Sequence, residues 1–228
     1  MRRAKWGRMV AASMVLMGMG CGCFGQTAAA NAPAHAAAVS VKVVAQSPAE
    51  TKTELQIFCL FAAGPGNVLN GSLAEINEKL HGLLEQVRKP GLFNGDLGET
   101  ILLTPGEGMP GAKRVLIIGL GDANGFTPAR MYLVGKIAWR EANRLGVEHP
   151  YFAPTILDGG VTGFATGEVA EQVVRGFRDA VAAQEVLRRG GAAGDLAVKD
   201  FVFLAGAKHA GDTQEGIDRA NGAKSASH

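Results

Sequence analysis

The sequence predicts a three-layer α/β/α domain with a mixed β-sheet. Apolar segments with the two-residue period of strands alternate with segments of helical period along residues 39–210, and this alternation is typical of helices packed on both faces of a sheet. Capping residues, prolines and glycines separate the segments. A region of about 170 residues suits one hydrophobic core. We therefore expect one domain at residues 39–210, followed by a polar C-terminal tail at residues 211–228.

Six segments have the pattern of β-strands. The first alternates valine with polar residues and predicts a half-buried strand, whereas the second is continuously apolar and suits a buried one. A turn-rich loop joins the third and fourth and could close a hairpin. Pro154 interrupts the fifth, and because proline lacks the N–H that a ladder needs, we expect this strand at an edge of the sheet. The six segments are 39–43, 55–62, 99–103, 114–118, 151–157 and 198–204.

Three segments have the pattern of amphipathic helices. The first starts at a capping box formed by Ser72 and Glu75, and its apolar face continues to Val87. The second opens at Thr127, because the following proline is favoured in the first helical turn. The third spans about residues 168–189 and turns an apolar stripe that includes Leu187 toward the core. Each helix is expected to cover one face of the sheet.

Residues 1–30 have the composition of a signal peptide. Basic residues precede an apolar stretch from Met9 to Gly20 that is too short to span a bilayer, and small residues offer a cleavage site after it. Alternatively, Cys21 is the lipidated first residue of a bacterial lipoprotein, so two processing routes stay open. Residues 31–38 then form a flexible tether. We expect an exported protein, periplasmic or extracellular, which contacts a membrane only through a lipid on Cys21.

The charge of the chain does not favour nucleic acid as a partner. The formal net charge is +2, and four of the cations lie in the predicted signal peptide, so the remaining chain is slightly acidic. Lysine and arginine are scattered along it, without the basic stripe and interleaved aromatic residues that a phosphate backbone requires.

The strongest candidate binding site is a glycine-containing loop after the fourth strand. Gly119 and Gly121 end an apolar strand, and Asn124 and Gly125 follow before a helix. Free backbone amides in such a loop could cradle a phosphate or another anion. The spacing is incomplete for a dinucleotide fingerprint, because Asn124 occupies the third glycine position. The alternative is that Gly119 and Gly121 only permit a tight turn.

No cofactor or metal site is predicted. The five histidines are dispersed, and none pairs with another histidine, cysteine or carboxylate at the spacing of metal ligands. Cys59 lies in an apolar segment and is expected to be a small core residue. The sequence also lacks the Gly-x-Ser-x-Gly motif of serine hydrolases. The histidines are His35, His81, His149, His209 and His228.

The ordered segments resemble the N-terminal domain of the M17 leucyl (cytosol) aminopeptidase family. The resemblance runs from about residue 55 to residue 205 and rests on the segments 71–84, 93–100 and 113–121. It implies a macro-domain-like α/β/α fold that serves assembly and access to the active site. In that family a separate C-terminal domain binds two metals and carries catalysis. None of its ligands has a counterpart here, so no catalytic or metal-binding residue is carried over.

Three functions follow as hypotheses. The first is an exported non-catalytic module that acts through protein contacts, either by self-association or by docking to a separate peptidase. The second is a small-ligand-binding domain for phosphate, a nucleotide or an ADP-ribose-like molecule. The third is a metal-dependent aminopeptidase, for which these residues supply no metal site. The family is typically cytosolic, so the export signal would give this domain a different location from its relatives.

Overall fold

The computed structural model describes residues 39–64, 68–89, 91–106 and 111–222. The predicted signal peptide, Cys21 and the tether lie outside these residues. Six strands form one sheet in the order β1-β6-β5-β2-β4-β3. All neighbouring strands are parallel except β3, which runs antiparallel to β4. The strands are β1 (Ser40–Ala45), β2 (Thr53–Leu60), β3 (Thr100–Leu103), β4 (Ala112–Gly119), β5 (Tyr151–Ala153) and β6 (Asp200–Ala205).

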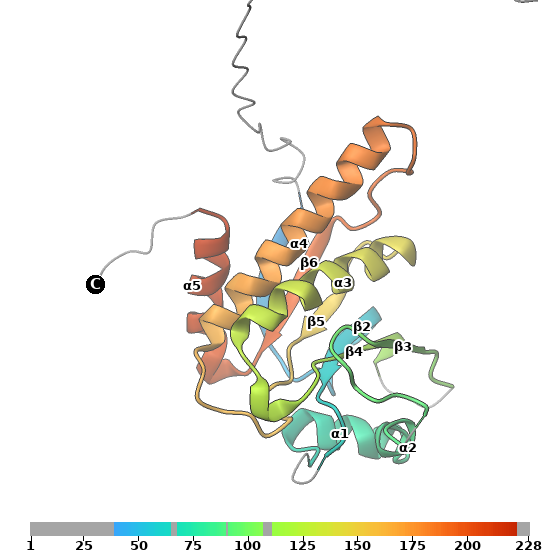
Figure 1. Cartoon of the computed structure of the whole chain (residues 1–228), viewed down its shortest axis with the longest axis vertical. Helices are drawn as coiled ribbons and strands as arrows, with labels where there is room; N and C mark the ends of the chain where they lie inside the picture. Colours follow the sequence, from blue (N-terminus) through green and yellow to red (C-terminus); the bar gives the residue numbers. More distant parts are fainter. Residues whose placement is uncertain (1–38, 65–67, 90, 107–110, 223–228) are drawn as a thin grey trace, which may run out of the picture. The chain divides into compact units, whose positions relative to one another are not determined.

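Helices cover both faces of the sheet, which confirms the three-layer α/β fold (Figure 1). Alternate residues of the strands point to opposite faces. In β2, Ile57 and Cys59 pack with the larger cluster under α3 (Met131–Arg144) and α4 (Thr166–Arg189). Phe58 and Leu60 pack with the smaller cluster over α1 (Gly71–Lys79) and α2 (Leu83–Val87). The core is therefore divided into two layers by the sheet.

The first predicted helix is interrupted, and its predicted capping box does not form. His81 and Gly82 adopt positive φ angles of 52° and 80° and separate α1 from α2. The N-cap of α1 is Asn70, without a side-chain capping bond, and the Ser72 hydroxyl instead binds the carboxylate of Asp158. The Asn77 side chain accepts a hydrogen bond of 3.0 Å from the Leu84 amide and so supports the start of α2.

The prediction that the fifth strand lies at an edge is wrong, because β5 pairs with both β2 and β6. The strand ends at Ala153, so Pro154 lies outside the ladder. Thr155 continues the connection to β2 through its side chain: the hydroxyl donates to the Cys59 carbonyl at 2.7 Å and accepts from the Cys59 amide at 3.0 Å. The Thr155 hydroxyl thus supplies a donor next to Pro154, which has no backbone N–H.

The helix α4 confirms the predicted third helix but not the role of Leu187. Val169, Val173 and Phe177 are buried in the larger core, as predicted. Leu187 is 48% exposed, because the C-terminal end of α4 extends past the sheet (Figure 1). The apolar face of α4 therefore continues in the sequence beyond the part of the helix that packs on the sheet.

The prediction that the chain ends in a polar tail from residue 211 is wrong, because α5 (Ala210–Ala220) belongs to the fold. Ile217 is fully buried in the larger core. A Cβ atom on Gly216 would overlap the Gly167 backbone. The helix α5 therefore approaches α4 more closely than a side chain at this position would allow. The segment looked polar because only one narrow face of α5 is buried.

Asp212 of α5 fixes the N-terminus of α4. Its carboxylate accepts hydrogen bonds of 2.7 Å from both the Thr166 hydroxyl and the Gly167 amide. The bond from Thr166 is the main cause that lowers the pKa of Asp212, with the Gly167 amide and Arg219 acting in the same direction. A carboxylate at this position also suits the positive end of the helix dipole.

We expect Asp212→Ala to lower the free energy of unfolding by about 1 kcal/mol, because the first turn of α4 loses an acceptor. The pKa of Asp212 is lower in the folded chain, so its contribution is fully present above the unfolded-state pKa, which is about 3.9, and is lost as the pH falls through the folded-state pKa. Urea denaturation at neutral and acidic pH measures both effects. Glu215→Ala on the same helix is the control, and an equal loss in both variants would contradict the capping role.

Candidate functional site

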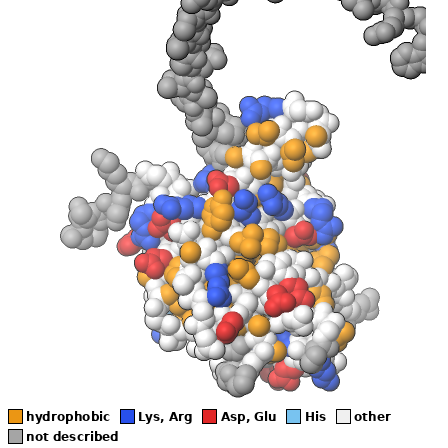
Figure 2. Space-filling view, in the orientation of Figure 1, with side chains coloured by type: hydrophobic (Ala, Val, Ile, Leu, Met, Phe, Trp, Pro, Cys, Tyr) orange, Lys and Arg blue, Asp and Glu red, His pale blue; other side chains and the backbone are white. Residues whose placement is uncertain are grey.

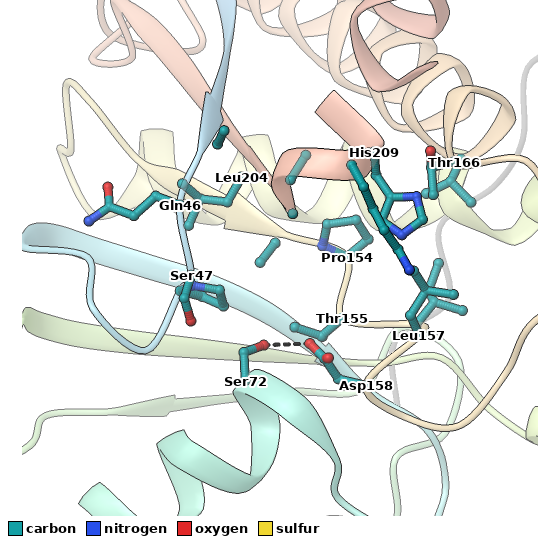
Figure 3. Close-up of a pocket in the computed structure, with 18 of the residues that line it drawn as sticks. Gln46, Ser47, Ser72, Pro154, Thr155, Leu157, Asp158, Thr166, Leu204 and His209 are labelled. Atoms are coloured by element: carbon teal, nitrogen blue, oxygen red, sulfur yellow. Dashed lines mark hydrogen bonds between the residues drawn. The ribbon is translucent and has the colours of Figure 1, made fainter. Parts of the chain in front are cut away.

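A pocket among the described residues lies at the carboxyl ends of β1, β5 and β6 (Figure 3). Its volume is about 490 Å³, within the range of about 300 to 1,000 Å³ that small-molecule sites occupy. In open α/β sheets, ligands bind outside the carboxyl ends of the parallel strands, where the loops leave a crevice. The strand order therefore places this carboxyl-end pocket where a ligand site is expected.

One wall of the carboxyl-end pocket combines the start of α1 with the loop after β5. The half-buried Asp158 accepts the hydrogen bond from the Ser72 hydroxyl, and its backbone carbonyl accepts from the Asn70 amide at 2.9 Å. Gly71 has a φ of 48°, and a Cβ atom there would overlap the Asp158 carboxylate. A glycine at this position lets α1 approach Asp158 closely and fixes the carboxylate at the wall.

Thr155 holds the loop after β5 in a strained conformation. Its φ is 49°, a value that is an outlier for a β-branched residue and that costs of the order of 1 to 3 kcal/mol. The two hydrogen bonds to Cys59 hold the residue in place. Strain of this kind is concentrated at functional sites, and here it directs the segment 155–158 along the pocket.

The opposite wall is formed by the short helix η4 (Ala207–His209), which leads directly into α5. It contributes Lys208, which is exposed, and His209, which is half-buried. Thr166, at the start of α4, lies beside His209 in Figure 3. Between the two walls the lining is mostly apolar and includes Ala153, Ile156, Phe164, Val169 and Leu204. The pocket therefore offers an apolar body with polar groups at opposite sides.

The predicted anion-binding loop uses three of its amides for hydrogen bonds within the fold. The Gly119 amide donates to the Glu99 carbonyl, and the Gly121 amide donates to the Gly95 carbonyl, both at 2.8 Å. The Asn124 amide donates to the Asp122 carboxylate at 2.9 Å. These three donors are used within the fold, and a carboxylate already lies beside the loop. The hydrogen bonds therefore do not favour anion binding by the amides of Gly119, Gly121 and Asn124.

The glycines of this loop permit close packing, and Gly121 also has the positive φ of the tight turn that is the alternative prediction. A Cβ atom on Gly119 would overlap the backbone of Gly95 and Asp96. Gly121 has a φ of 75°, and a Cβ atom on Gly125 would lie 2.8 Å from the Arg130 guanidinium. The end of β4 is therefore packed closely against the neighbouring loop.

The described histidines are not grouped into a metal site. His81 is exposed at the break between α1 and α2, and His209 lines the carboxyl-end pocket. Among the described residues, no group of three or more histidine, cysteine, aspartate or glutamate side chains could hold a metal ion. His35 and His228 lie outside the described residues. Cys59 is fully buried, as predicted, and burial raises the pKa of its thiol.

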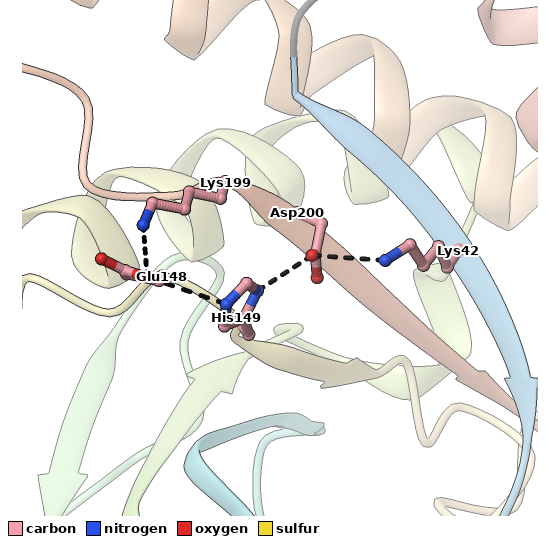
Figure 4. Close-up of polar contacts among 5 residues, drawn as sticks. All are labelled: Lys42, Glu148, His149, Lys199 and Asp200. Atoms are coloured by element: carbon pink, nitrogen blue, oxygen red, sulfur yellow. Dashed lines mark hydrogen bonds and ion pairs between the residues drawn. The ribbon is translucent and has the colours of Figure 1, made fainter.

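His149 belongs to a surface network at the amino ends of β5 and β6 (Figure 4). Its Nδ1 lies 2.9 Å from the Asp200 carboxylate, which also pairs with Lys42 at 3.3 Å. Glu148 pairs with Lys199 at 2.7 Å, and that hydrogen bond is the main cause that lowers the pKa of Glu148. Exposed ion pairs of this kind contribute little to stability. The network links β1 and β6 to the segment before β5 at the surface.

The family of the chain is decided by a match along most of the domain. The model of the N-terminal domain of the cytosol aminopeptidase family matches residues 59–189. The chain belongs to this family. A probable cytosol aminopeptidase of Burkholderia mallei (strain ATCC 23344) is 39% identical over 72 residues, which are 32% of this chain and 14% of that protein. One of Burkholderia pseudomallei (strain K96243) has the same identity and coverage. The matched stretch therefore spans a small part of these relatives.

Solved structures of the same fold include both aminopeptidases and macrodomains. A tomato leucine aminopeptidase mutant superposes with a TM-score of 0.56 at 16% identity, covering 81% of this chain and 36% of that enzyme. A macrodomain mutant from Oceanobacillus iheyensis has a TM-score of 0.57 at 14% identity and covers 81% and 94%. The Trypanosoma brucei macrodomain in complex with ADP-ribose has a TM-score of 0.53 at 15% identity, covering 79% and 68%. These likenesses establish a macrodomain-like fold for this aminopeptidase-family domain.

Sequence reasoning missed the carboxyl-end pocket, although its parts follow predicted strands. Residues 46–48 follow the first strand, 155–158 the fifth and 206–209 the last. The rule that ligands bind at carboxyl strand ends would have selected these segments. It needs the strand order, and the sequence alone does not state that β1, β6 and β5 are neighbours.

No described helix is long and apolar enough to cross a bilayer.

Proposed function

We propose that this domain is a non-catalytic binding module whose ligand site is the carboxyl-end pocket. The observation that carries the proposal is the pocket itself: about 490 Å³ at the ends of three strands, with an apolar body and a few polar groups on opposite walls. This combination is the usual composition of a small-molecule site. The strained Thr155 in its lining supports the same interpretation.

The related folds suggest the first compounds to test. Macrodomains of this fold have been solved in complex with ADP and with ADP-ribose, so an ADP-ribose-like ligand is one candidate class. The other candidates are phosphate and small metabolites with an apolar body. Calorimetry with ADP-ribose, ADP, inorganic phosphate and an amino-acid mixture covers these classes.

A matched pair of substitutions places the site. Ala207→Trp in η4 puts a large side chain at the pocket and is expected to weaken binding of a pocket ligand at least about tenfold by steric exclusion. Ala129→Trp in the short helix η3 (Pro128–Arg130), which lies outside the pocket lining, is the control. Binding that is equally strong in both variants would show that the site is elsewhere.

A protein-contact role is the second candidate, and an exposed apolar surface favours it. Leu97, Leu102 and Leu133 are each about two-fifths exposed. Leu97 precedes Gly98, which approaches Leu133 on α3. Leu102 lies opposite Leu116 of the core under α3, and so on the same face of the sheet. Figure 2 shows hydrophobic side chains among the charged ones on the face that includes α3 and α4. Exposed apolar clusters often mark protein contacts.

The leucine surface formed by Leu97, Leu102 and Leu133 could serve self-association or docking to a separate peptidase. We expect Leu102→Lys combined with Leu133→Lys to abolish either contact while the monomer stays folded, because both side chains are already partly in water. Light scattering measures self-association, and pull-down from the envelope fraction detects a partner. A wild-type protein that is monomeric and retains no partner would contradict this role.

We also propose that the protein is exported and that it has no catalytic activity. Cell fractionation with Cys21→Ser tests both the location and the lipid route, because only a lipoprotein would leave the membrane fraction on this change. Turnover of leucine p-nitroanilide by the purified chain with added manganese or zinc, abolished by a chelator, would contradict the non-catalytic role.

A further inference from the structure

The charges that line the carboxyl-end pocket are of opposite sign and come from opposite walls. Asp158 lies beside Ser72 on one side, and His209 lies on the other (Figure 3). Lys208 precedes His209 in η4 and also lines the pocket. Within the described part of the chain, neither Asp158 nor Lys208 has an ion-pair partner within 4 Å. Among the described residues, the side chain that binds the Asp158 carboxylate is the neutral hydroxyl of Ser72.

The surface between these charges is apolar. Ala153, Ile156, Val169 and Leu204 are buried residues of the two cores, and they line the floor. A ligand body that covers this floor would remove apolar area from water at both surfaces. The charged groups would then interact across a medium of lower polarity, where each interaction is stronger than in water.

We propose that the pocket binds a zwitterion with an apolar body, which carries an ammonium group at one end and a carboxylate at the other. The inference rests on the proposed ligand-binding function. Asp158 accepts hydrogen bonds from the ammonium group, and Lys208 donates to the carboxylate, with His209 as a second donor. Charge-assisted hydrogen bonds of this kind are roughly twice as strong as neutral ones. Short apolar peptides with free termini and linear ω-amino acids share this chemistry.

A polyphosphate fits these charges less well. A nucleoside diphosphate carries several negative charges, whereas the lining supplies one permanent cation, Lys208, and a carboxylate, Asp158. The carboxylate would repel the phosphates, and repulsion of like charges is a usual means of excluding a wrong ligand. The fold allows an ADP-ribose-like ligand, but the lining favours a molecule with no net charge.

Calorimetry with matched probes tests the charge pairing. The probes are 6-aminohexanoate, which has both charges, and hexanoate and hexylamine, which have one each. Leucyl-leucine, its N-acetyl form and its amide form make the same comparison for a peptide. We expect each zwitterion to bind at least about tenfold more tightly than its single-charge analogues, because each charged hydrogen bond is worth about this factor. The stronger of the two zwitterions identifies the ligand source.

Two substitutions assign the ends of the ligand. Asp158→Asn should weaken binding of the zwitterion and of hexylamine about tenfold and leave the binding of hexanoate unchanged. Lys208→Met should weaken binding of the zwitterion and of hexanoate and leave the binding of hexylamine unchanged. Lys52→Met, at an exposed position outside the lining, is the control. The melting temperature of each variant checks that the fold is intact.

The outcomes separate this inference from the proposed function. If ADP-ribose binds, Ala207→Trp blocks it and no zwitterion binds, the charge inference is wrong and the pocket remains a ligand site. Zwitterion binding that is unchanged in both Asp158→Asn and Lys208→Met also overturns the inference. If no probe binds, or if Ala207→Trp leaves every binding event unchanged, both the inference and the proposed ligand site are wrong.

Discussion

Phe177→Ala is expected to lower the free energy of unfolding by about 4 kcal/mol, the largest effect of a single substitution that we predict. Phe177 is fully buried on α4. Its ring packs edge-on against Trp139 of α3, at 6.2 Å between centroids, and lies 4.9 Å from the ring of Phe201 on β6. The substitution removes the contact that joins two helices to the sheet and leaves a cavity. Urea denaturation of the purified domain measures the loss.

Leu187→Ala is the control on the same helix. Leu187 is 48% exposed and lies at the end of α4 that extends past the sheet, so the expected change is within about 0.5 kcal/mol. Equal losses at the two positions would mean that the packing of α4 differs from that described. A destabilisation of Phe177→Ala below about 1 kcal/mol would contradict its central place in the core.

Gly176→Ala is expected to cost about 3 kcal/mol, although alanine is ordinarily the better helix former. The added Cβ atom would overlap the Tyr132 carbonyl oxygen and lie 2.8 Å from the Tyr132 carbonyl carbon. Gly135 on α3 makes the reciprocal approach to the backbone of Val173. Because backbone rather than a flexible side chain is in the way, the two helices must move apart.

Gly211→Ala separates this clash from helix propensity. Gly211 lies in α5 with no atom within 4 Å of an added Cβ, so alanine there should stabilise the protein by about 0.5 kcal/mol. Thermal unfolding compares the two variants directly. A neutral or stabilising Gly176→Ala would show that α3 and α4 are further apart than their glycine contact implies.

The sequence patterns predicted the layers well because burial follows the period of each element. The continuously apolar segment at 55–62 became β2, whose alternate residues fill both cores. The same patterns failed where tertiary contacts overrode a local rule. Ser72 has the spacing of a capping box but binds Asp158, which is distant in the sequence. Pro154 suggests an edge strand, yet the side chain of Thr155 continues the pairing to β2.

The candidate site could be predicted only in part, because backbone donors are visible in a sequence but their partners are not. The loop at Gly119 and Gly121 has the residues of an anion cradle, yet its amides bind the carbonyls of Gly95 and Glu99. The carboxyl-end pocket depends on the order of the strands. Asp158 and His209 lie about fifty residues apart in the sequence, and the pairing of β5 with β6 brings the segments that follow these two strands to one pocket.

The match identifies the family of the domain, and the role of the domain must be argued from its own residues. The relatives are described as probable cytosol aminopeptidases, and the matched stretch is 14% of their length. A leucine aminopeptidase and macrodomains share the fold at 14 to 16% identity, a level at which the site must be argued from its geometry. For this chain that geometry is the carboxyl-end pocket.

The most direct test of the pocket as a ligand site is an amide chemical-shift titration of the labelled domain with 6-aminohexanoate, leucyl-leucine and ADP-ribose in separate arms. We expect shifts in the segments 45–48, 155–158 and 206–209 for the ligand that binds, and little change at residues 119–125. Shifts confined to residues 119–125, or no shifts with any of the three compounds, would contradict it.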